Sequence, residues 1–426
     1  MTRRISIKEI LSLKGKKILG INPPIEDFAF FDLWSKPVGI LYLLQRMREN
    51  GNKISFIDAI HEAACGKKTY GREKITSVEI EKPKVYSEIK RNYHRFGLSG
   101  EKLTERLRTA EKPDIIFLTS IMTYWYGGVK HTIETVKKEL PDTPIVLGGI
   151  YARLCPEHAS SLGADMTVTE NWEPDAAMPA MDLYGTLPYG VTMTSFGCPL
   201  SCDYCASHVL WNRYRRRPLD EVLKEIDFQY ELGARDFAFY DDALLIDKEN
   251  YFYPMCKEIR KKYKGEIRLH TPNGLHVRQI DEKCSQIMRE NGLLTIRLSL
   301  ESIDPKIART SSGKVAREEY ASAVKHLLAS GYQSSDCETY ILLGLPGQSV
   351  QSVKDTINFV HESGGKPKLA EFSPIPGTKS FEEAAKKLPE IKSEPLLQNN
   401  SVYSSWISGE ITPETLQELK DCARGR

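Results

Sequence analysis

The stretch SFGCPLSCDYCASH, residues 195–208, places Cys198, Cys202 and Cys205 within eight residues, and His208 follows three positions later. Thiols this close in sequence indicate a metal centre, and two chemistries fit. Zinc accepts a closed set of three cysteines and one histidine, whereas a 4Fe–4S cluster on three thiolates keeps one iron open. Zinc ribbons take ligand pairs from separate segments, while all the ligands here share one loop, which favours the iron–sulfur cluster.

The cysteine loop directly follows the first of a series of apolar runs with strand character. The runs cover residues 189–197, 236–242, 267–274, 295–302, 337–345 and 369–375. Helical patterns such as REEYASAVKHLLASG lie between them. Alternating strands and helices predict parallel β/α units. Over residues 189–376 we expect a partial (β/α)6 barrel with its active-site loops at the carboxyl ends of the strands.

The preceding residues, 1–175, show a similar alternation. Strand-like runs occur at 16–22, 53–58, 113–120, 143–149 and 164–170, with a helical pattern at 38–50 that stops at Gly51. This order predicts an α/β domain with a Rossmann-like, doubly wound parallel sheet. The charged stretch at about 67–112 predicts a helical insertion. Residues 171–190, rich in Pro and Gly, predict a linker, and residues 377–426 predict a small, mostly helical C-terminal extension.

Length and composition bound the class of protein. A chain of 426 residues exceeds one ordinary core and predicts two domains. A net charge of +2 gives no whole-molecule argument for nucleic acid or an anionic membrane. The N-terminal residues lack the apolar core of a signal peptide, and no apolar run approaches transmembrane length. We therefore expect a cytoplasmic protein without a membrane partner, whose nine cysteines are thiols or metal ligands.

The segment CPLSCDYC resembles the C-x3-C-x2-C signature of radical S-adenosylmethionine (SAM) enzymes, including an aromatic residue, Tyr204, before the last cysteine. The resemblance extends over the six predicted β/α units. It implies that Cys198, Cys202 and Cys205 hold a 4Fe–4S cluster whose open iron binds SAM. His208 is then a bystander.

The same resemblance implies SAM contacts at the ends of later strands. FYDDALL, LSLES and LLGLPGQS end the second, fourth and fifth runs, and glycine lets backbone approach a ligand closely. The alternatives are a helix cap, a strand end and a plain turn, respectively. The residues expected to contact SAM are Tyr204, Asp241, Asp242, Ser299, Glu301, Gly344 and Gly347.

A doubly wound domain ahead of such a barrel is similar to the cobalamin-dependent branch of the family. The resemblance implies that loops at the carboxyl ends of the sheet face the corrin, although each could be an ordinary connection. Many cobalamin proteins carry Asp-x-His-x-x-Gly after the first strand, and this chain has none there; NYHRFG, residues 92–97, has Asn92 instead and lies in the insertion. The residues expected to contact cobalamin are Asn22, Pro24, Ser120, Thr123, Gly148 and Gly149.

These cofactors imply reductive cleavage of SAM to a 5′-deoxyadenosyl radical and methyl transfer from methylcobalamin to an unactivated carbon. The implied partners are a small-molecule or peptide substrate and an electron donor such as flavodoxin or ferredoxin. No side chain is assigned as a catalytic acid or base. One alternative is a cobalamin-free radical SAM dehydratase, epimerase or cyclase with the first domain as a cap.

Two other functions are disfavoured by the sequence. Methylthiolation needs three further N-terminal cysteines, and only Cys65 and Cys155 precede the motif. A zinc-stabilised binding module is the non-enzymatic alternative. The run NRYRRRP, with Arg213, Arg215, Arg216 and Arg217, suits phosphate or carboxylate recognition or a solvated face.

Overall fold

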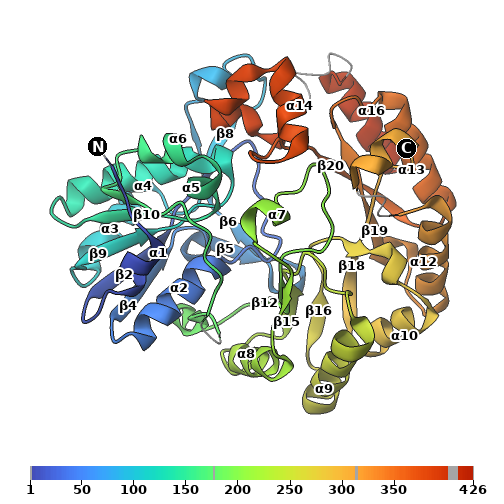
Figure 1. Cartoon of the computed structure of the whole chain (residues 1–426), viewed down its shortest axis with the longest axis horizontal. Helices are drawn as coiled ribbons and strands as arrows, with labels where there is room; N and C mark the ends of the chain where they lie inside the picture. The colour runs from blue at the N-terminus through green and yellow to red at the C-terminus, as the bar shows by residue number, and fades with distance from the viewer. Residues whose placement is uncertain (1, 176–177, 312–314, 402–410, 426) are drawn as a thin grey trace. The chain divides into compact units, whose positions relative to one another are not determined.

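The computed structural model describes residues 2–175, 178–311, 315–401 and 411–425. The chain divides into two compact units (Figure 1). Unit 1 comprises residues 1–187 together with 390–399, and unit 2 comprises residues 188–389 and 400–426. In the described ranges, no helix is both long enough and apolar enough to cross a membrane.

Unit 1 is built on a six-stranded sheet in the order β1-β11-β10-β9-β2-β4, whose paired neighbours are parallel. Its strands are β1 (Arg3–Arg4), β2 (Lys17–Asn22), β4 (Lys53–Asp58), β9 (Ile115–Leu118), β10 (Ile145–Leu147) and β11 (Met166–Thr167). Every strand predicted for this domain is present. The chain runs from β2 out to β4 and then returns past β2 to β9, so the direction of winding reverses between β2 and β9. Open α/β sheets bind ligands at such a switch point.

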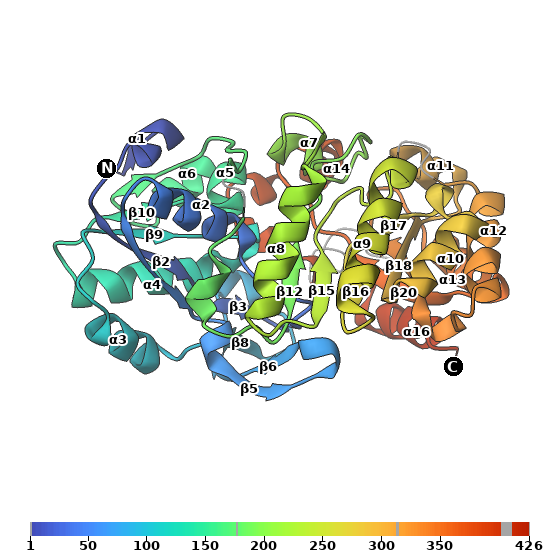
Figure 2. The same cartoon turned by 90° about the horizontal axis from the view of Figure 1, so that it is seen from below.

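Helices cover both faces of this sheet because side chains alternate along its strands. Leu19 and Ile21 of β2 belong to a core shared with α3 (Gly100–Thr109) and α4 (Tyr126–Glu139). Gly20 belongs to the other face, where α2 (Val38–Glu49) packs (Figure 2). A Cβ on Gly20 would lie 2.6 Å from a methyl carbon of Leu44, so glycine permits the close approach of this helix.

The insertion in unit 1 differs from the predicted helical segment at 67–112. It contains the strands β5 (Ala64–Lys67), β6 (Glu73–Ile75), β7 (Ser77–Ile80) and β8 (Tyr93–Phe96), and helix α3 begins only at Gly100. β8 pairs antiparallel with β7 and with β3 (Ile25–Asp27). These strands are short and largely exposed, so they lack the buried apolar alternation that identifies a strand in sequence.

Unit 2 is an open, parallel barrel-like sheet in the order β12-β15-β16-β18-β19-β20, with β17 paired to β18. Its strands are β12 (Gly190–Thr192), β15 (Asp236–Phe239), β16 (Arg268–His270), β17 (Leu275–His276), β18 (Leu293–Glu301), β19 (Cys337–Leu343) and β20 (Lys366–Glu371). The strand path starts at β12 and ends at β20, which agrees with the predicted partial barrel. Figure 1 shows helices outside the strands: α8 (Leu219–Glu231), α9 (Tyr253–Tyr263), α10 (Glu282–Glu290), α12 (Arg317–Ala329) and α13 (Val350–Glu362).

The residues after the barrel are divided between the two units, unlike the single helical extension predicted for 377–426. Helices α14 (Lys379–Lys387) and α16 (Pro413–Ala423) belong to unit 2. Residues 390–399 belong to unit 1, where the hydroxyl of Tyr86 donates a 2.8 Å hydrogen bond to the carbonyl of Leu396. Unit 1 is therefore completed by a segment that follows the barrel in sequence. The first unit also extends past residue 175 and includes most of the predicted linker.

Candidate functional site

The cysteine loop lies at the carboxyl end of β12, directly after the short strand β13 (Ser195–Phe196). β13 pairs antiparallel with β14 (Arg215–Arg216), which closes the base of the loop. Asp203, inside the loop, fixes its other side. The amide of Asp203 donates to the carbonyl of Thr310 at 2.8 Å, and its carboxylate is 2.9 Å from the ammonium of Lys379. The loop is thus anchored within unit 2 at its base and at Asp203.

The three sulfur atoms lie in a partly buried setting. Cys202 is buried, and Cys198 and Cys205 are half-buried. Backbone amides point at two of them: Leu200 N lies 3.5 Å from Cys198 Sγ, and Ser207 N lies 3.4 Å from Cys205 Sγ. Such amide hydrogen bonds to sulfur tune iron–sulfur clusters.

Electrostatics at the loop favour a bound cationic centre. Burial raises the pKa of Cys205 to about 11, with further contributions from Asp242, Cys202 and Cys198. Without a metal this thiol is protonated at neutral pH, and metal binding would drive its deprotonation. His208, in contrast, is exposed on α7 (Ser207–Leu210).

The structure brings together two of the residues predicted to contact SAM, Tyr204 and Glu301. Burial raises the pKa of Tyr204 far above its usual range, and the neighbouring carboxylate of Glu301 adds to this effect. Glu301 ends β18, is buried, and has φ 69°. A left-handed conformation is costly for a residue with a side chain, and such residues cluster at functional sites. Ser299 is buried on the same strand.

Asp241 and Asp242, also predicted to contact SAM, both bind the cysteine loop and its base. The carboxylate of Asp241 is buried and accepts hydrogen bonds from the Thr194 amide at 2.9 Å and the Ser195 hydroxyl at 2.7 Å. Burial raises the pKa of Asp241. Asp242 accepts a 2.6 Å hydrogen bond from the hydroxyl of Ser207. Their observed role is to order this loop, and a contact with SAM stays a prediction.

Gly344 and Gly347 form a turn after β19, with φ of 90° and 80°. The side chain of Gln348 closes the turn: its carbonyl accepts from the Gly344 amide at 3.0 Å, and its amino group donates to the Leu342 carbonyl at 2.8 Å. The positive φ angles explain why glycine is needed here. Backbone contact with adenine stays a prediction.

The arginine run after the loop is partly used inside unit 2. Arg217 is buried and lies 2.8 Å from the carboxylate of Glu225. Arg216 donates to the Thr194 hydroxyl at 2.8 Å and stacks over the ring of Tyr251 at 4.5 Å. These two arginines therefore have structural partners within unit 2.

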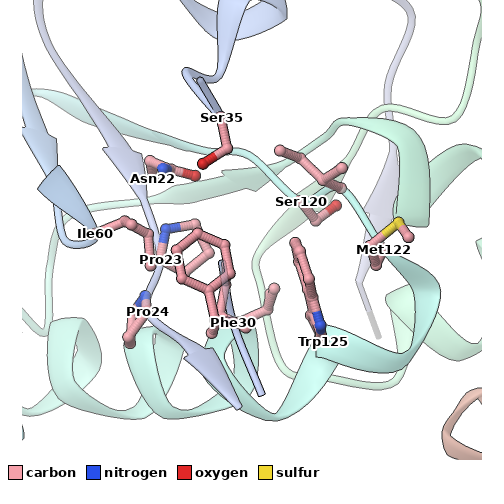
Figure 3. A pocket seen from close by; sticks show the side chains of 12 residues that line it. Asn22, Pro23, Pro24, Phe30, Ser35, Ile60, Ser120, Met122 and Trp125 are labelled. Atoms are coloured by element: carbon pink, nitrogen blue, oxygen red, sulfur yellow. The ribbon is translucent and has the colours of Figure 1, made fainter. Parts of the chain in front are cut away.

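Unit 1 has a pocket at the switch point between β2 and β9 (Figure 3). The lining is largely apolar, and among the described residues that form it none carries a titratable side chain. Of the residues predicted to contact cobalamin, Asn22, Pro24 and Ser120 line it. The other lining residues were not among the individual contacts predicted: Pro23, Ile25, Phe30, Ser35, Ile60, Ile121, Met122, Trp125 and Val129.

The remaining three predicted contacts lie outside the pocket lining. Thr123 is buried in the segment after β9. The hydroxyl of Ser120 donates to the carbonyl of Gly148 at 2.7 Å, which ties the glycine pair to the pocket. A Cβ on Gly148 would meet nothing within 4 Å, whereas a Cβ on Gly149, at φ 94°, would lie 2.3 Å from the Ser120 carbonyl oxygen. Gly148 thus faces open space, and Gly149 is required by the backbone.

A charged cluster in unit 1 resembles a metal site in composition. Ligand atoms of Asp32, His61 and Glu73 lie within 4.8 Å of one another. The buried ammonium of Lys36 stands 4.0 Å over the ring of Tyr184, and the same carboxylates, with Asp58, oppose the lowering of its pKa by burial. A cluster that contains its own cation is better described as an ion-pair network. It also fixes the pocket, because Asp32 accepts from the Ser35 amide at 3.0 Å.

Comparison with protein-family models assigns a domain family to part of each unit. Residues 192–360 match the model of the radical SAM superfamily, and residues 89–177 match that of the B12 binding domain. The chain joins a B12-binding domain to a radical SAM domain. The cofactors of these two domains are a 4Fe–4S cluster, SAM and cobalamin. The B12-binding match includes Ser120 and the glycine pair but begins after β2, which supplies Asn22.

Individual relatives agree with this assignment. An uncharacterised methyltransferase, PH0819, of Pyrococcus horikoshii is 28% identical over 211 residues, which are 48% of this chain and 44% of the relative. The fold is shared with the radical SAM methyltransferase TsrM of Kitasatospora setae, solved with cobalamin and a [4Fe–4S] cluster (TM-score 0.62, 13% identity, 88% of this chain and 75% of that one). It is shared also with the cobalamin-dependent radical enzyme OxsB, solved with aqua-cobalamin (TM-score 0.56, 13% identity, 92% and 57%). The chain spans about half the length of the curated relatives it matches.

Proposed function

We propose that this protein is a cobalamin-dependent radical SAM methyltransferase that acts on an unactivated carbon. The observation that carries the proposal is the occurrence of two sites in one chain. A three-cysteine loop lies at the carboxyl end of the first strand of a radical SAM domain. An apolar pocket lies at the switch point of the sheet whose later part matches the B12-binding model.

The residues of the two sites fit these cofactors, and neither cofactor needs a further protein ligand. Cys198, Cys202 and Cys205 would hold the cluster, with amide hydrogen bonds to Cys198 and Cys205 already in place. The pocket offers shape and apolar contact rather than a ligand for cobalt, so cobalamin would bind here without a coordinating side chain. The bound cofactors would supply a 5′-deoxyadenosyl radical and a methyl group, and the protein contributes position and exclusion of water.

The chain's own residues perform the positioning. Asp241 and Asp242 hold the cysteine loop at its base and at Ser207. Tyr204 and Glu301 lie close together beside Cys202, where they would contact SAM. The substrate would be a small molecule or a peptide. A radical that removes hydrogen from an unactivated carbon needs no acid or base on the protein. An electron donor such as flavodoxin or ferredoxin would reduce the cluster.

The test is anaerobic reconstitution of the full chain with iron, sulfide and hydroxocobalamin, followed by desalting and quantification. We expect about four irons per chain, as for a single 4Fe–4S cluster, together with about one corrin. Cys202→Ser should lose most of the iron. Cys65→Ser, at an exposed cysteine outside the loop, should retain it.

With both cofactors bound, transfer of the labelled methyl group of SAM to a substrate fraction is the activity assay. Iron without corrin would overturn the cobalamin part of the proposal and would favour a cobalamin-free radical SAM enzyme. Zinc in place of iron would overturn the whole proposal.

A further inference from the structure

Two aromatic side chains form one wall of the pocket in unit 1. Phe30 and Trp125 both line the pocket, and their rings meet edge to face with centroids 6.1 Å apart. Figure 3 shows the indole of Trp125 standing beside Phe30, with its nitrogen at the end away from Ser120. The ring therefore presents carbon atoms to the pocket, and its only polar atom points elsewhere.

The polar atom of Trp125 is held by a buried carboxylate. Trp125 Nε1 donates a 2.7 Å hydrogen bond to Asp27 Oδ2. Asp27 is 4% exposed, so its charge needs donors within the protein. Its second oxygen accepts from the Phe28 amide at 2.6 Å and from Asn399 Nδ2 at 3.0 Å.

Asn399 belongs to the segment 390–399, which returns to unit 1 after the barrel. Its side chain is fully buried. The neighbouring amide, Gln398, is also buried but donates to the carbonyl of Ile391 at 2.8 Å. Of these two adjacent side chains, that of Asn399 donates a hydrogen bond to Asp27, the carboxylate that also accepts from Trp125 in the pocket wall.

We propose that Asp27 and Asn399 are positioning residues that fix the Trp125 ring as the cobalamin-facing wall of the pocket; this rests on the proposed function. Without this restraint the half-buried side chain of Trp125, which ends the short 3-10 helix Thr123–Trp125, could adopt several rotamers, and each rotamer that does not line the pocket would reduce the binding-competent population. The hydrogen bonds from Asn399 to Asp27 and from Trp125 to Asp27 select one orientation before the ligand arrives. Preorganisation of this kind raises affinity by lowering the entropic cost of binding.

The experiment measures the affinity of the full-length protein for hydroxocobalamin by titration of its visible spectrum. Asn399→Ala should weaken binding about threefold to tenfold, which corresponds to one lost hydrogen bond. Gln398→Ala is the matched control, since it removes a buried amide from the same segment; we expect its affinity to stay within about twofold of wild type. Thermal unfolding checks that both variants are folded, and Asp27→Asn replaces Asn399→Ala if the latter does not fold.

A double-mutant cycle tests whether Asn399 acts through the indole. Trp125→Phe removes the N–H donor but keeps an aromatic wall, so adding Asn399→Ala to it should cause no further loss of affinity. Equal affinities for Asn399→Ala and Gln398→Ala, or additive effects in the cycle, would overturn the inference alone. Failure of the wild-type protein to bind cobalamin would overturn the proposed function and the inference with it.

Discussion

Replacing Arg217 with methionine is predicted to destabilise unit 2 severely. The guanidinium is 3% exposed and lies 2.8 Å from the carboxylate of Glu225, which is 0% exposed. It also donates to the carbonyl of Met193 at 2.7 Å, next to the base of the cysteine loop. Arg217→Met removes this guanidinium from the buried carboxylate of Glu225, whose other contacts include Gln229 Nε2 at 3.5 Å.

The magnitude follows from the cost of separating a buried charge from its ion-pair partner. Breaking a buried ion pair by removing one partner costs about 3–5 kcal/mol. The unpaired Met193 carbonyl adds about 1 kcal/mol. Arg213→Met, at an exposed position of the same run, should change stability by less than about 0.5 kcal/mol.

Urea unfolding of the metal-free protein, followed by circular dichroism, measures these differences. The double variant Arg217→Met with Glu225→Met should be more stable than Arg217→Met alone, since no charge is left buried. Iron retained after reconstitution should fall with Arg217→Met and not with Arg213→Met. A stability loss below about 1 kcal/mol for Arg217→Met, or a double variant no better than the single one, would refute the argument that this arginine is structural.

Three further predictions concern single groups. Burial lowers the pKa of His131 from 6.5 to about 4. The free energy of unfolding that this residue contributes above pH 6.5 should therefore be lost as the pH falls towards 4. His131→Gln should flatten this pH dependence when thermal unfolding is compared at pH 7 and pH 5. In the metal-free protein at pH 8, mass spectrometry should find Cys205, with its pKa raised to about 11, alkylated far more slowly than the exposed Cys65. Gly149→Ala should unfold unit 1, because its Cβ would strike the backbone of Ser120, whereas Gly148→Ala should leave thermal stability within about 0.5 kcal/mol of wild type.

The strands that carry the site could be predicted because each is a buried apolar run between turn residues. β2, β4 and β9 coincide closely with the predicted runs, and so do β18 and β19 in unit 2. The cysteine motif could be predicted because its three residues are local in sequence. The strands of the insertion escaped prediction because most residues of β5, β6 and β7 are exposed, which leaves no buried apolar alternation to detect.

The positions of individual side chains were harder to predict than the strands. The resemblance implied a SAM contact for Asp241 at the end of a strand, and this contact stays a prediction; the structure adds that its carboxylate is buried against Thr194 and Ser195. Nothing local distinguishes a carboxylate that faces a ligand from one that ties down a loop, since both follow a strand. Trp125 and Phe30 were not among the predicted contacts for the converse reason. An aromatic residue after a strand usually packs in a core, and only tertiary structure shows which ones line a pocket.

The return of residues 390–399 to unit 1 could not be predicted either, and it changes how the pocket is understood. In a short segment such as EPLLQNN, the two leucines indicate burial but do not indicate against which core the segment packs. In the structure, the carbonyl of Leu396 accepts a hydrogen bond from Tyr86. The side chain of Asn399 donates to Asp27, whose carboxylate also accepts from Trp125. Most of the side chains that line the pocket are thus local to the segments after β2 and β9, but the orientation proposed for Trp125 depends on Asn399, in the segment that follows the barrel. A B12-binding domain defined by sequence similarity alone, at residues 89–177, omits both Asp27 and Asn399.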